Sequence, residues 1–252
     1  MTDYADPGEL ARQVATCPRP LLLGLDVDGV LAPIVAHADD AALLDGMGAA
    51  VSAVAALDGV HVAVVSGRSL DGLAQFGFGD DVDMIGSHGM ETRDHPMVPL
   101  TDVERTRLAA LDAAAVEAAD RAGAGAWIER KPASVVLHVR EADDASGANA
   151  IEELVAAALR IAGATTKAGS GVLEAFARHA DKGTALVALG AERGVATTVF
   201  VGDDVTDEDA FARLSPTDVA IKVGDADTIA PHRLRDPAAV LAFLQTLTTT
   251  FA

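Results

Sequence analysis

Short apolar runs alternate along the chain with Ala-rich stretches whose apolar residues recur at the spacing of a helix. The apolar runs predict strands at residues 21–25, 60–65, 84–85, 198–201 and 219–223. The Ala-rich stretches predict helices at residues 40–57, 69–75, 181–193, 207–214 and 237–247. We expect the last residues, TLTTTFA, to be frayed. Strands that alternate with helices indicate an α/β fold in which a parallel sheet is flanked by helices.

The middle of the chain shows a different pattern. A long helical stretch at residues 101–123 is followed by two strands on either side of a Lys-Pro turn, a helix near residues 147–162 and two further short strands. Two helices with several strands can form a small α/β layer of their own. We therefore expect an inserted cap domain at residues 95–177 and a core domain formed by residues 1–94 and 178–252.

Charge and composition exclude several classes of partner. The chain has 38 Asp and Glu against 19 Lys and Arg, a net charge of -19, which argues against nucleic acid because phosphate backbones bind basic surfaces. No apolar stretch approaches the roughly 18 residues of a membrane span, and the start MTDYADPGEL lacks the features of a signal peptide. Cys17 is the single cysteine, which excludes an internal disulfide and a Cys-rich metal site. We expect a cytoplasmic monomer whose partner is a small molecule.

Two carboxylates, Asp26 and Asp28, follow the first apolar run in LLLGLDVDGVL. Like charges at the edge of a core are costly unless something binds them. Because they lie two residues apart on an extended chain, the two side chains point the same way and can share one pocket. Gly29 allows a sharp turn after them. The alternative is an Asx-type turn after a strand, and this segment alone does not separate the two interpretations.

Two further segments combine polar residues with a strand end or a helix start. Ser66 and Gly67 follow the second apolar run, where a hydroxyl and free backbone N–H groups suit an anion, although a plain turn is the commoner meaning of this pattern. Asp181 has the position of a helix cap, and Lys182 lies in the first turn of that helix. A lysine there opposes the helix dipole, so it either has an anionic partner or is simply solvated.

The segment VFVGDDVTDEDAF concentrates five acidic residues at a strand end and a helix start: Asp203, Asp204, Asp207, Glu208 and Asp209. Acidic residues near a helix N-terminus are favourable in general. That account does not explain why the cluster follows an apolar strand and a glycine. An oxygen-rich site for Mg²⁺ does explain it, because hard cations prefer carboxylate and carbonyl ligands.

The order of these segments, Asp-x-Asp-Gly, Ser-Gly-Arg, Asp-Lys-Gly and Gly-Asp-Asp-x-x-Asp, resembles the haloacid dehalogenase superfamily of phosphatases. GSHGMET, IERKPASVVLHVR, DKGTAL and GDDVTDEDAF are similar to segments of the trehalose-6-phosphate phosphatases, and the resemblance runs from about residue 21 to residue 244. It implies a Rossmann-like core whose parallel sheet is flanked by helices, with an inserted smaller α/β cap. It also implies Mg²⁺-dependent hydrolysis of trehalose 6-phosphate through an aspartyl-phosphate.

The resemblance also implies roles for individual residues. Asp26 would attack phosphorus, and Asp28 would protonate the departing sugar oxygen and then deprotonate water. Ser66 and Lys182 would stabilise the phosphoryl oxygens. Mg²⁺ would be bound by Asp26, the backbone carbonyl of Asp28 and Asp203, with Asp207 orienting waters in the outer shell. The residues expected to bind substrate are Ser66, Gly67, Arg68, His88, Glu91, Glu129, Lys131 and Glu174.

The chain departs from the family pattern in two places. Val30 stands where the superfamily usually has Thr, so that hydroxyl is lost while the backbone N–H remains. After Glu174 the chain continues AFARHADKG, where the family commonly has a short basic-proline stretch. The second departure lies at the cap hinge, so it bears on the identity of the sugar more than on catalysis.

Three alternatives stay open. The same chemistry can act on sucrose phosphate, a mannosylglycerate-type phosphate or a pseudo-disaccharide phosphate, and a phosphomutase would transfer the phosphoryl group to a second sugar. The third alternative is a non-catalytic sugar-phosphate sensor. Such a sensor typically lacks the nucleophile, the acid/base Asp or a metal ligand, whereas this chain has Asp26, Asp28, Lys182 and Asp203.

Overall fold

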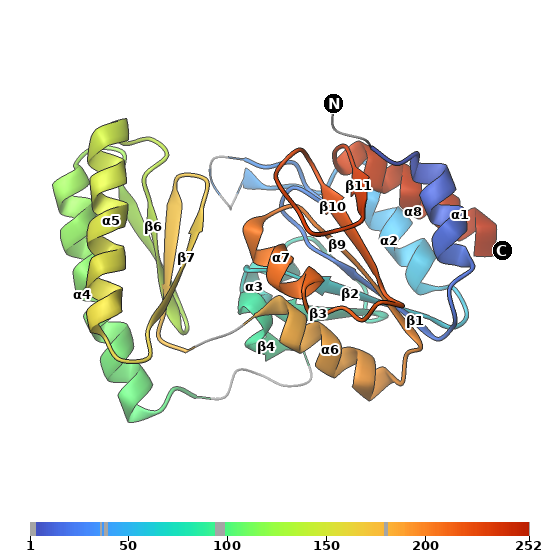
Figure 1. Cartoon of the computed structure of the whole chain (residues 1–252), viewed down its shortest axis with the longest axis horizontal. Coiled ribbons are helices and arrows are strands. Elements are labelled where there is room, and N and C mark those ends of the chain that lie inside the picture. The colour runs from blue at the N-terminus through green and yellow to red at the C-terminus, as the bar shows by residue number, and fades with distance from the viewer. Residues whose placement is uncertain (1–3, 36, 38–39, 94–98, 179–180, 252) are drawn as a thin grey trace. The chain divides into compact units, whose positions relative to one another are not determined.

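The computed structural model describes residues 4–35, 37, 40–93, 99–178 and 181–251. The chain forms two compact units, the larger from Met1–Met97 with Ala180–Ala252 and the smaller from Val98–His179 (Figure 1). The predicted boundary between residues 94 and 95 lies outside the described residues. That the smaller unit selects the substrate stays a prediction.

Among the described residues, the sheet of the larger unit has seven strands in the order β11-β10-β9-β1-β2-β3-β4. Their bounds are β1 (Leu21–Leu25), β2 (Val60–Val65), β3 (Val82–Gly86), β4 (Glu91–Thr92), β9 (Thr197–Gly202), β10 (Val219–Val223) and β11 (His232–Leu234). All neighbouring pairs are parallel except β3 with β4. In the central strand β1, Leu25 pairs with Val64 on one side and Val201 on the other, so β1, β2 and β9 end at one edge of the sheet.

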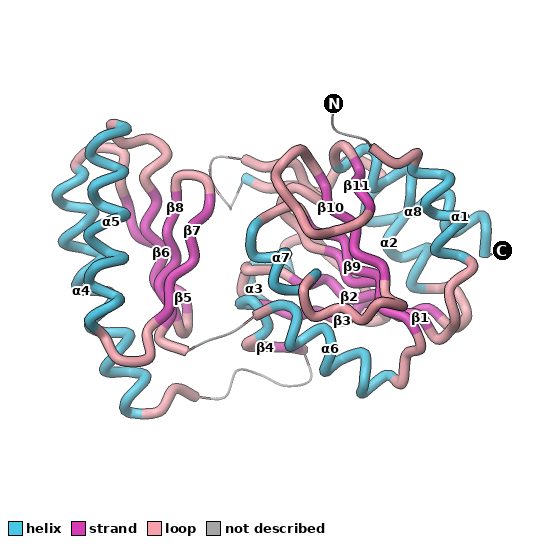
Figure 2. The backbone as a smooth tube through the Cα atoms, in the orientation of Figure 1, coloured by secondary structure: helices cyan, strands magenta, loops and turns pink. Residues whose placement is uncertain are grey.

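Helices cover both faces of this sheet (Figure 2). The helices are α1 (Pro7–Ala15), α2 (Met47–Ala55), α3 (Leu70–Ala74), α6 (Lys182–Arg193), α7 (Val205–Phe211) and α8 (Pro237–Phe251). Leu21, Leu23 and Leu25 pack into a buried cluster with residues of α1, α2 and α8. Leu22 packs on the opposite face, in a cluster with residues of α6 and α7. Because β1 is buried on both faces, its five residues are all apolar or Gly.

The predicted fold class is confirmed, and the differences from prediction concern single elements. The helix predicted at 40–57 begins only at Met47. Gly46, the residue before it, has a φ of 82°, and a right-handed helix cannot include a residue in this left-handed conformation. The helix α1 was not predicted, although the Asp6 side chain accepts a hydrogen bond from Glu9 N–H and Pro7 occupies the first helical turn. The expectation of a frayed end was wrong. Helix α8 continues to Phe251, whose ring lies 4.0 Å from the Arg19 guanidinium carbon.

The smaller unit has a four-stranded antiparallel sheet in the order β5-β6-β8-β7. Its strands are β5 (Trp127–Lys131), β6 (Ser134–His138), β7 (Thr165–Gly169) and β8 (Val172–Phe176), and its helices are α4 (Asp102–Ala122) and α5 (Asp144–Arg160). Both helices pack on the same face of the sheet (Figure 1). On that face Val135 and Leu137 meet Leu111 and Leu154 in a cluster separate from the core of the larger unit. None of the helices in the described ranges has the length and apolarity to cross a bilayer.

Candidate functional site

Asp26 lies at the carboxyl end of β1, and its backbone N–H still pairs with Val201 O at 3.0 Å, so it continues the strand for one more residue. Its side chain is buried, with only 5 % of the residue exposed. Oδ1 accepts a hydrogen bond from Val27 N–H at 2.7 Å, and Oδ2 lies 2.8 Å from Lys182 Nζ. These contacts hold the carboxylate in one orientation.

Lys182 is the first residue of α6, and Asp181 caps that helix by accepting from Thr184 N–H. The ammonium of Lys182 is buried and reaches both Asp26 Oδ2 at 2.8 Å and Asp207 Oδ1 at 2.9 Å. Burial alone would lower the pKa of Lys182, but the charges of Asp207 and Asp26 raise it above its usual range. The lysine therefore stays charged, and its anionic partners offset the unfavourable position at the helix N-terminus.

Asp207 is fully buried and uses both carboxylate oxygens. Oδ1 accepts from Lys182 Nζ, and Oδ2 accepts from the backbone N–H groups of Asp203 at 2.9 Å and Asp204 at 3.0 Å. Glycines make room for these carboxylates, because a side chain at Gly202 would collide with Asp207 and one at Gly29 with Asp203. Gly29 also has a φ of 77°, which favours glycine.

One carboxylate oxygen from each of Asp26, Asp203 and Asp207 lies within 4.8 Å of the others. Burial raises the pKa of Asp26 well above its usual range, although Lys182 acts in the opposite direction. Burial, with the charge of Asp207 beside it, raises the pKa of Asp203 to about 7. Lys182 contacts two of these three carboxylates, and the charge of Lys222 lowers the pKa of Asp203 without cancelling the effect of burial. Oxygen donors that are close together and short of positive charge fit Mg²⁺ or another hard divalent cation.

Asp28 does not join this cluster through its side chain. Arg68 holds it in a bidentate ion pair, with Nε donating to Oδ2 and Nη2 donating to Oδ1, both at 2.7 Å. The Asp28 side chain is 41 % exposed and so remains accessible. The sequence placed Arg68 among the substrate-binding residues and gave no sign of its pairing with Asp28. Val30, where Thr was the usual residue, is fully buried in the apolar core.

Ser66 follows β2 at the same sheet edge as Asp26, and it is almost completely buried. Its hydroxyl accepts a hydrogen bond from Arg68 N–H at 3.2 Å, which forms a tight turn. Its carbonyl accepts from His88 N–H at 3.0 Å, and the His88 ring lies against Gly67. The structure therefore brings Ser66, Gly67, Arg68 and His88 together next to Asp28.

The segment Ser87–Gly89, which contacts the turn at Ser66 through His88, has an unusual backbone conformation. Ser87 and His88 have left-handed φ values of 49° and 56°, which non-glycine residues rarely adopt. Glu91 supports the segment, because its Oε1 accepts from Ser87 Oγ at 2.7 Å and from Leu70 N–H, at the start of α3, at 3.0 Å. Strained backbone of this kind is common at functional sites. Glu91 thus ties two loops of the site together.

The predicted residues of the smaller unit lie on the sheet face opposite α4 and α5. Lys131 Nζ lies 3.1 Å from Glu174 Oε2, and Glu174 Oε1 accepts from Ser134 Oγ at 2.5 Å. Glu129 Oε2 lies 3.1 Å from His138 Nε2, and this hydrogen bond lowers the pKa of Glu129. Lys131 and Glu174 therefore form one group and Glu129 and His138 another.

Two basic residues near the cluster, Lys222 and Arg213, were not predicted from the sequence. Lys222 in β10 is 1 % exposed, and its Nζ lies 3.3 Å from both Asp204 O and Glu208 Oε1. A lysine in the apolar run VAIKV was the signal that could have revealed a buried partner. Arg213 pairs with Asp181 through two hydrogen bonds of 3.0 Å and so supports the start of α6.

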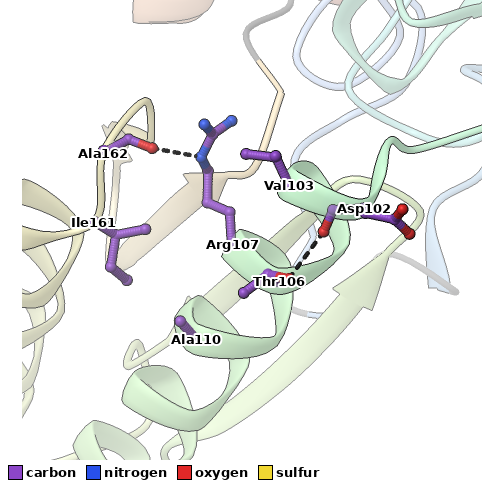
Figure 3. Close-up of a pocket in the computed structure, with 7 residues that line it drawn as sticks. All are labelled: Asp102, Val103, Thr106, Arg107, Ala110, Ile161 and Ala162. Atoms are coloured by element: carbon purple, nitrogen blue, oxygen red, sulfur yellow. Dashed lines mark hydrogen bonds between the residues drawn. The ribbon is translucent and has the colours of Figure 1, made fainter.

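A groove of about 380 Å³ lies in the smaller unit and contains none of the predicted site residues. Its lining is Asp102, Val103, Thr106, Arg107, Ala110, Ile161 and Ala162 (Figure 3). Arg107 crosses from α4 and donates from Nε to Ala162 O at 2.7 Å. Its guanidinium thus connects α4 to the loop after α5, which is a structural role.

Comparisons with known proteins find relatives that match nearly the whole chain. The chain is 32% identical over 242 residues to a probable trehalose-phosphate phosphatase of Oryza sativa subsp. japonica, covering 90% of this chain and 65% of that protein. It is 33% identical over 242 residues to a trehalose-phosphate phosphatase of Mycobacterium ulcerans, covering 90% of this chain and 61% of that protein. An uncharacterized glycosyl hydrolase of Mycobacterium tuberculosis is 35% identical over 94% of this chain and 19% of its own length.

The chain therefore spans less than two thirds of these relatives. In structure, the C-terminal domain of Candida albicans trehalose-6-phosphate phosphatase superimposes with a TM-score of 0.85 at 20% identity, covering 99% of this chain and 98% of that one. This likeness supports the fold. The family described as trehalose-phosphatase matches residues 24–237. The protein accordingly belongs to the trehalose-phosphatase family.

Proposed function

We propose that the protein is a Mg²⁺-dependent phosphatase that hydrolyses trehalose 6-phosphate to trehalose and phosphate. One observation carries the proposal: the buried Asp26 carboxylate contacts the Lys182 ammonium and lies within 4.8 Å of carboxylate oxygens of Asp203 and Asp207. A carboxylate held beside a charged lysine and a cation site is suited to attack a phosphate. Membership of the trehalose-phosphatase family supports the substrate class.

In the first half of the reaction, a carboxylate oxygen of Asp26 forms a bond to phosphorus while the bond from phosphorus to the sugar oxygen breaks. Asp28 gives a proton to the departing sugar oxygen. In the second half, Asp28 takes a proton from water, whose oxygen attacks phosphorus and frees Asp26. Both Asp28 oxygens accept from Arg68 in this structure, so Asp28 would carry its proton on one oxygen while Arg68 keeps hold of the other. The side chain of Asp28 is more exposed than that of Asp26, as contact with sugar and water requires.

Asp26, Asp203 and the backbone carbonyl of Asp28 would hold Mg²⁺, and the metal would reduce the repulsion between a carboxylate and a phosphate dianion. The two oxygens of Asp207 are already engaged by Lys182 and by backbone N–H groups. Its contribution is therefore to position Lys182 and the loop that carries Asp203, in keeping with an outer-shell role. The buried Ser66 and Lys182 would stabilise charge on the phosphoryl oxygens.

The remaining predicted residues would bind the substrate. Gly67, Arg68 and His88 adjoin Ser66, and Glu91 supports their loops, so this group would contact the phosphoryl end. Glu129, Lys131 and Glu174 would form hydrogen bonds with sugar hydroxyls. Their side chains are held by His138, by each other and by Ser134, so little side-chain entropy is lost when a sugar binds. Monomeric state and cytoplasmic location stay predictions of the sequence.

The test is phosphate release in the presence of Mg²⁺ from trehalose 6-phosphate, glucose 6-phosphate and sucrose 6-phosphate. Preference for the trehalose ester, lost in Asp26→Asn and after chelation of Mg²⁺, is the expected result. Asp120→Asn, at an exposed position of α4, is the matched control and should keep full activity. Preference for another disaccharide phosphate would keep the chemistry and change the substrate. No release from any ester would contradict the proposal and favour a sugar-phosphate sensor.

A further inference from the structure

The sheet of the smaller unit has two chemically different faces. Val135 and Leu137 of β6 belong to the cluster formed with α4 and α5. The alternate positions point the other way, because successive side chains of a strand lie on opposite faces. On β5 these are Trp127, Glu129 and Lys131, which lie opposite His138, Val136 and Ser134 of β6. Among the described residues of this unit, both helices pack on the face of Val135 and Leu137, which we call the first face. The other, second face has no described helix of this unit packed on it and carries polar and aromatic side chains.

The aromatic end of this second face is a rigid stack. The rings of Trp127 and His138 are parallel within 1°, with their centroids 3.7 Å apart. His138 is held in turn by Glu129, whose Oε2 lies 3.1 Å from Nε2. The imidazole therefore supports the indole from one side and cannot rotate freely. Trp127 itself is 37 % exposed, whereas the core of this unit uses only aliphatic residues against its helices.

The polar end of the same face is also pre-arranged. Lys131, Ser134 and Glu174 are joined by contacts of 3.1 Å and 2.5 Å, and all three are buried or partly buried. Lys131 lies four positions after Trp127 along β5, which at about 3.3 Å per residue places the two ends roughly 13 Å apart. A flat aromatic surface at one end and hydrogen-bonding groups at the other match a ligand made of two linked sugar rings.

We propose that the Trp127–His138 stack is a sugar-binding subsite on which one pyranose ring of a disaccharide phosphate lies. The C–H groups of one side of a pyranose are slightly positive and pack against the negative face of an indole ring. The hydroxyls of the other ring would meet Lys131, Ser134 and Glu174. This inference rests on the proposed function and adds to it a contact between Trp127 and one of the two sugar rings, because a single ring cannot occupy both ends.

The chain contains one tryptophan, so its fluorescence reports directly on the subsite. The experiment titrates trehalose 6-phosphate into Asp26→Asn protein with Mg²⁺, and calorimetry measures binding independently. A saturating change in emission at the ligand concentration found by calorimetry is expected. Binding seen by calorimetry without a change in emission would overturn the proposal. Glucose 6-phosphate, which has one ring, should bind more weakly and change the emission less.

Kinetics of substituted proteins separate stacking from a general structural effect. Trp127→Ala should raise KM for trehalose 6-phosphate about 2- to 12-fold with little change in kcat, since aromatic contacts of this kind contribute roughly 0.5–1.5 kcal/mol. Trp127→Phe keeps a flat ring and should restore most of the loss. Hydrolysis of p-nitrophenyl phosphate, which has no sugar, should not change. Leu159→Ala, at an 83 % exposed position of α5, is the control in the same unit.

The outcomes distinguish the two proposals. If the native protein hydrolyses trehalose 6-phosphate but Trp127→Ala leaves KM unchanged, the stacking subsite is wrong and the proposed function stands. If the native protein hydrolyses another disaccharide phosphate, the same variants are assayed on that ester. If it hydrolyses none, the proposed function fails. The subsite is then tested separately by adding trehalose and measuring Trp127 fluorescence, and an unchanged emission would overturn the subsite.

Discussion

Asp207 accepts hydrogen bonds on both carboxylate oxygens, from the Lys182 ammonium and from two backbone N–H groups. An asparagine has the same shape, but its NH₂ group would face a donor whichever way the amide turned. We therefore expect Asp207→Asn to lower the free energy of unfolding by about 1–3 kcal/mol or more, as buried donors lose their acceptor. Urea unfolding measures this change. Asp209→Asn, exposed on the same helix, should cost much less, and equal effects would contradict the argument.

The raised pKa of Asp203 should make the stability of the folded protein depend on pH. Burial and the charge of Asp207 raise its pKa from 3.8 to about 7, so the folded protein without metal holds this proton more tightly than the unfolded chain. The stability that this group contributes is fully present below about pH 4 and is lost as pH rises through about 7. Mg²⁺ binds the ionised carboxylate, so it should offset that loss.

Thermal unfolding with and without Mg²⁺ tests this prediction. The increase in Tm caused by Mg²⁺ should be larger at pH 8 than at pH 5.5, because protons compete with the metal at the lower pH. In Asp203→Asn the position no longer titrates, and the difference between the two pH values should shrink. An increase in Tm that is the same at both pH values in the native protein would count against a metal site at Asp203.

Much of the cluster could be predicted at the residue scale. Asp26 and Asp203 each follow an apolar strand, Lys182 starts a helix and Asp207 lies in the first turn of another. Parallel strands bring such positions to one edge, so their place directly after a strand or at a helix start indicated the cluster, and the family resemblance supplied the roles. The pairing of Arg68 with Asp28 could not be predicted, because it depends on how two loops meet. For the same reason, nothing in the sequence indicated that Glu91 would bond to Leu70 N–H and Ser87 Oγ.

At the scale of elements, the start of α7 depends on a buried lysine. Lys222 Nζ lies 3.3 Å from Asp204 O and from Glu208 Oε1, so it links β10 to the loop that carries Asp203. Lys222→Met keeps the length of the side chain but removes this link. We expect it to weaken Mg²⁺ binding about tenfold by letting the loop shift, which calorimetric titration measures. Glu208→Gln keeps a hydrogen-bond acceptor and should have a smaller effect; an unchanged affinity in Lys222→Met would refute the link.

The bounds of an element could be predicted where the burial of a strand requires a run of apolar residues in the sequence. β1, β2 and β10 have the predicted bounds because strands buried on both faces are nearly continuous apolar runs, interrupted here only by His61 in β2 and Lys222 in β10. The short edge strands β4, with the sequence ET, and β11, with the sequence HRL, have no such run and were not predicted. The start of α2 was misplaced because an apolar period does not show that Gly46 adopts a left-handed conformation.

At the scale of the whole molecule, the smaller unit has a hydrophobic core of its own. We expect a fragment of residues 99–178 to fold alone, with a stability of no more than about 3–5 kcal/mol, as is usual for a domain of this size. Thermal unfolding followed by circular dichroism should show one cooperative transition. Leu111→Ala, at a fully buried position, should abolish it. If the unsubstituted fragment shows no cooperative transition, the smaller unit does not fold on its own core and this prediction is wrong.

The order of the strands has a consequence for synthesis on the ribosome. β1 pairs with β2 on one side and with β9 on the other, and the whole smaller unit lies between β2 and β9 in the chain. A nascent chain therefore contains Asp26 well before it contains Lys182 or Asp203. Until β9 emerges, one edge of an apolar strand has no partner and is open to pairing with another chain. This interval is where a chaperone would be needed most, and truncated chains that end before β9 should aggregate.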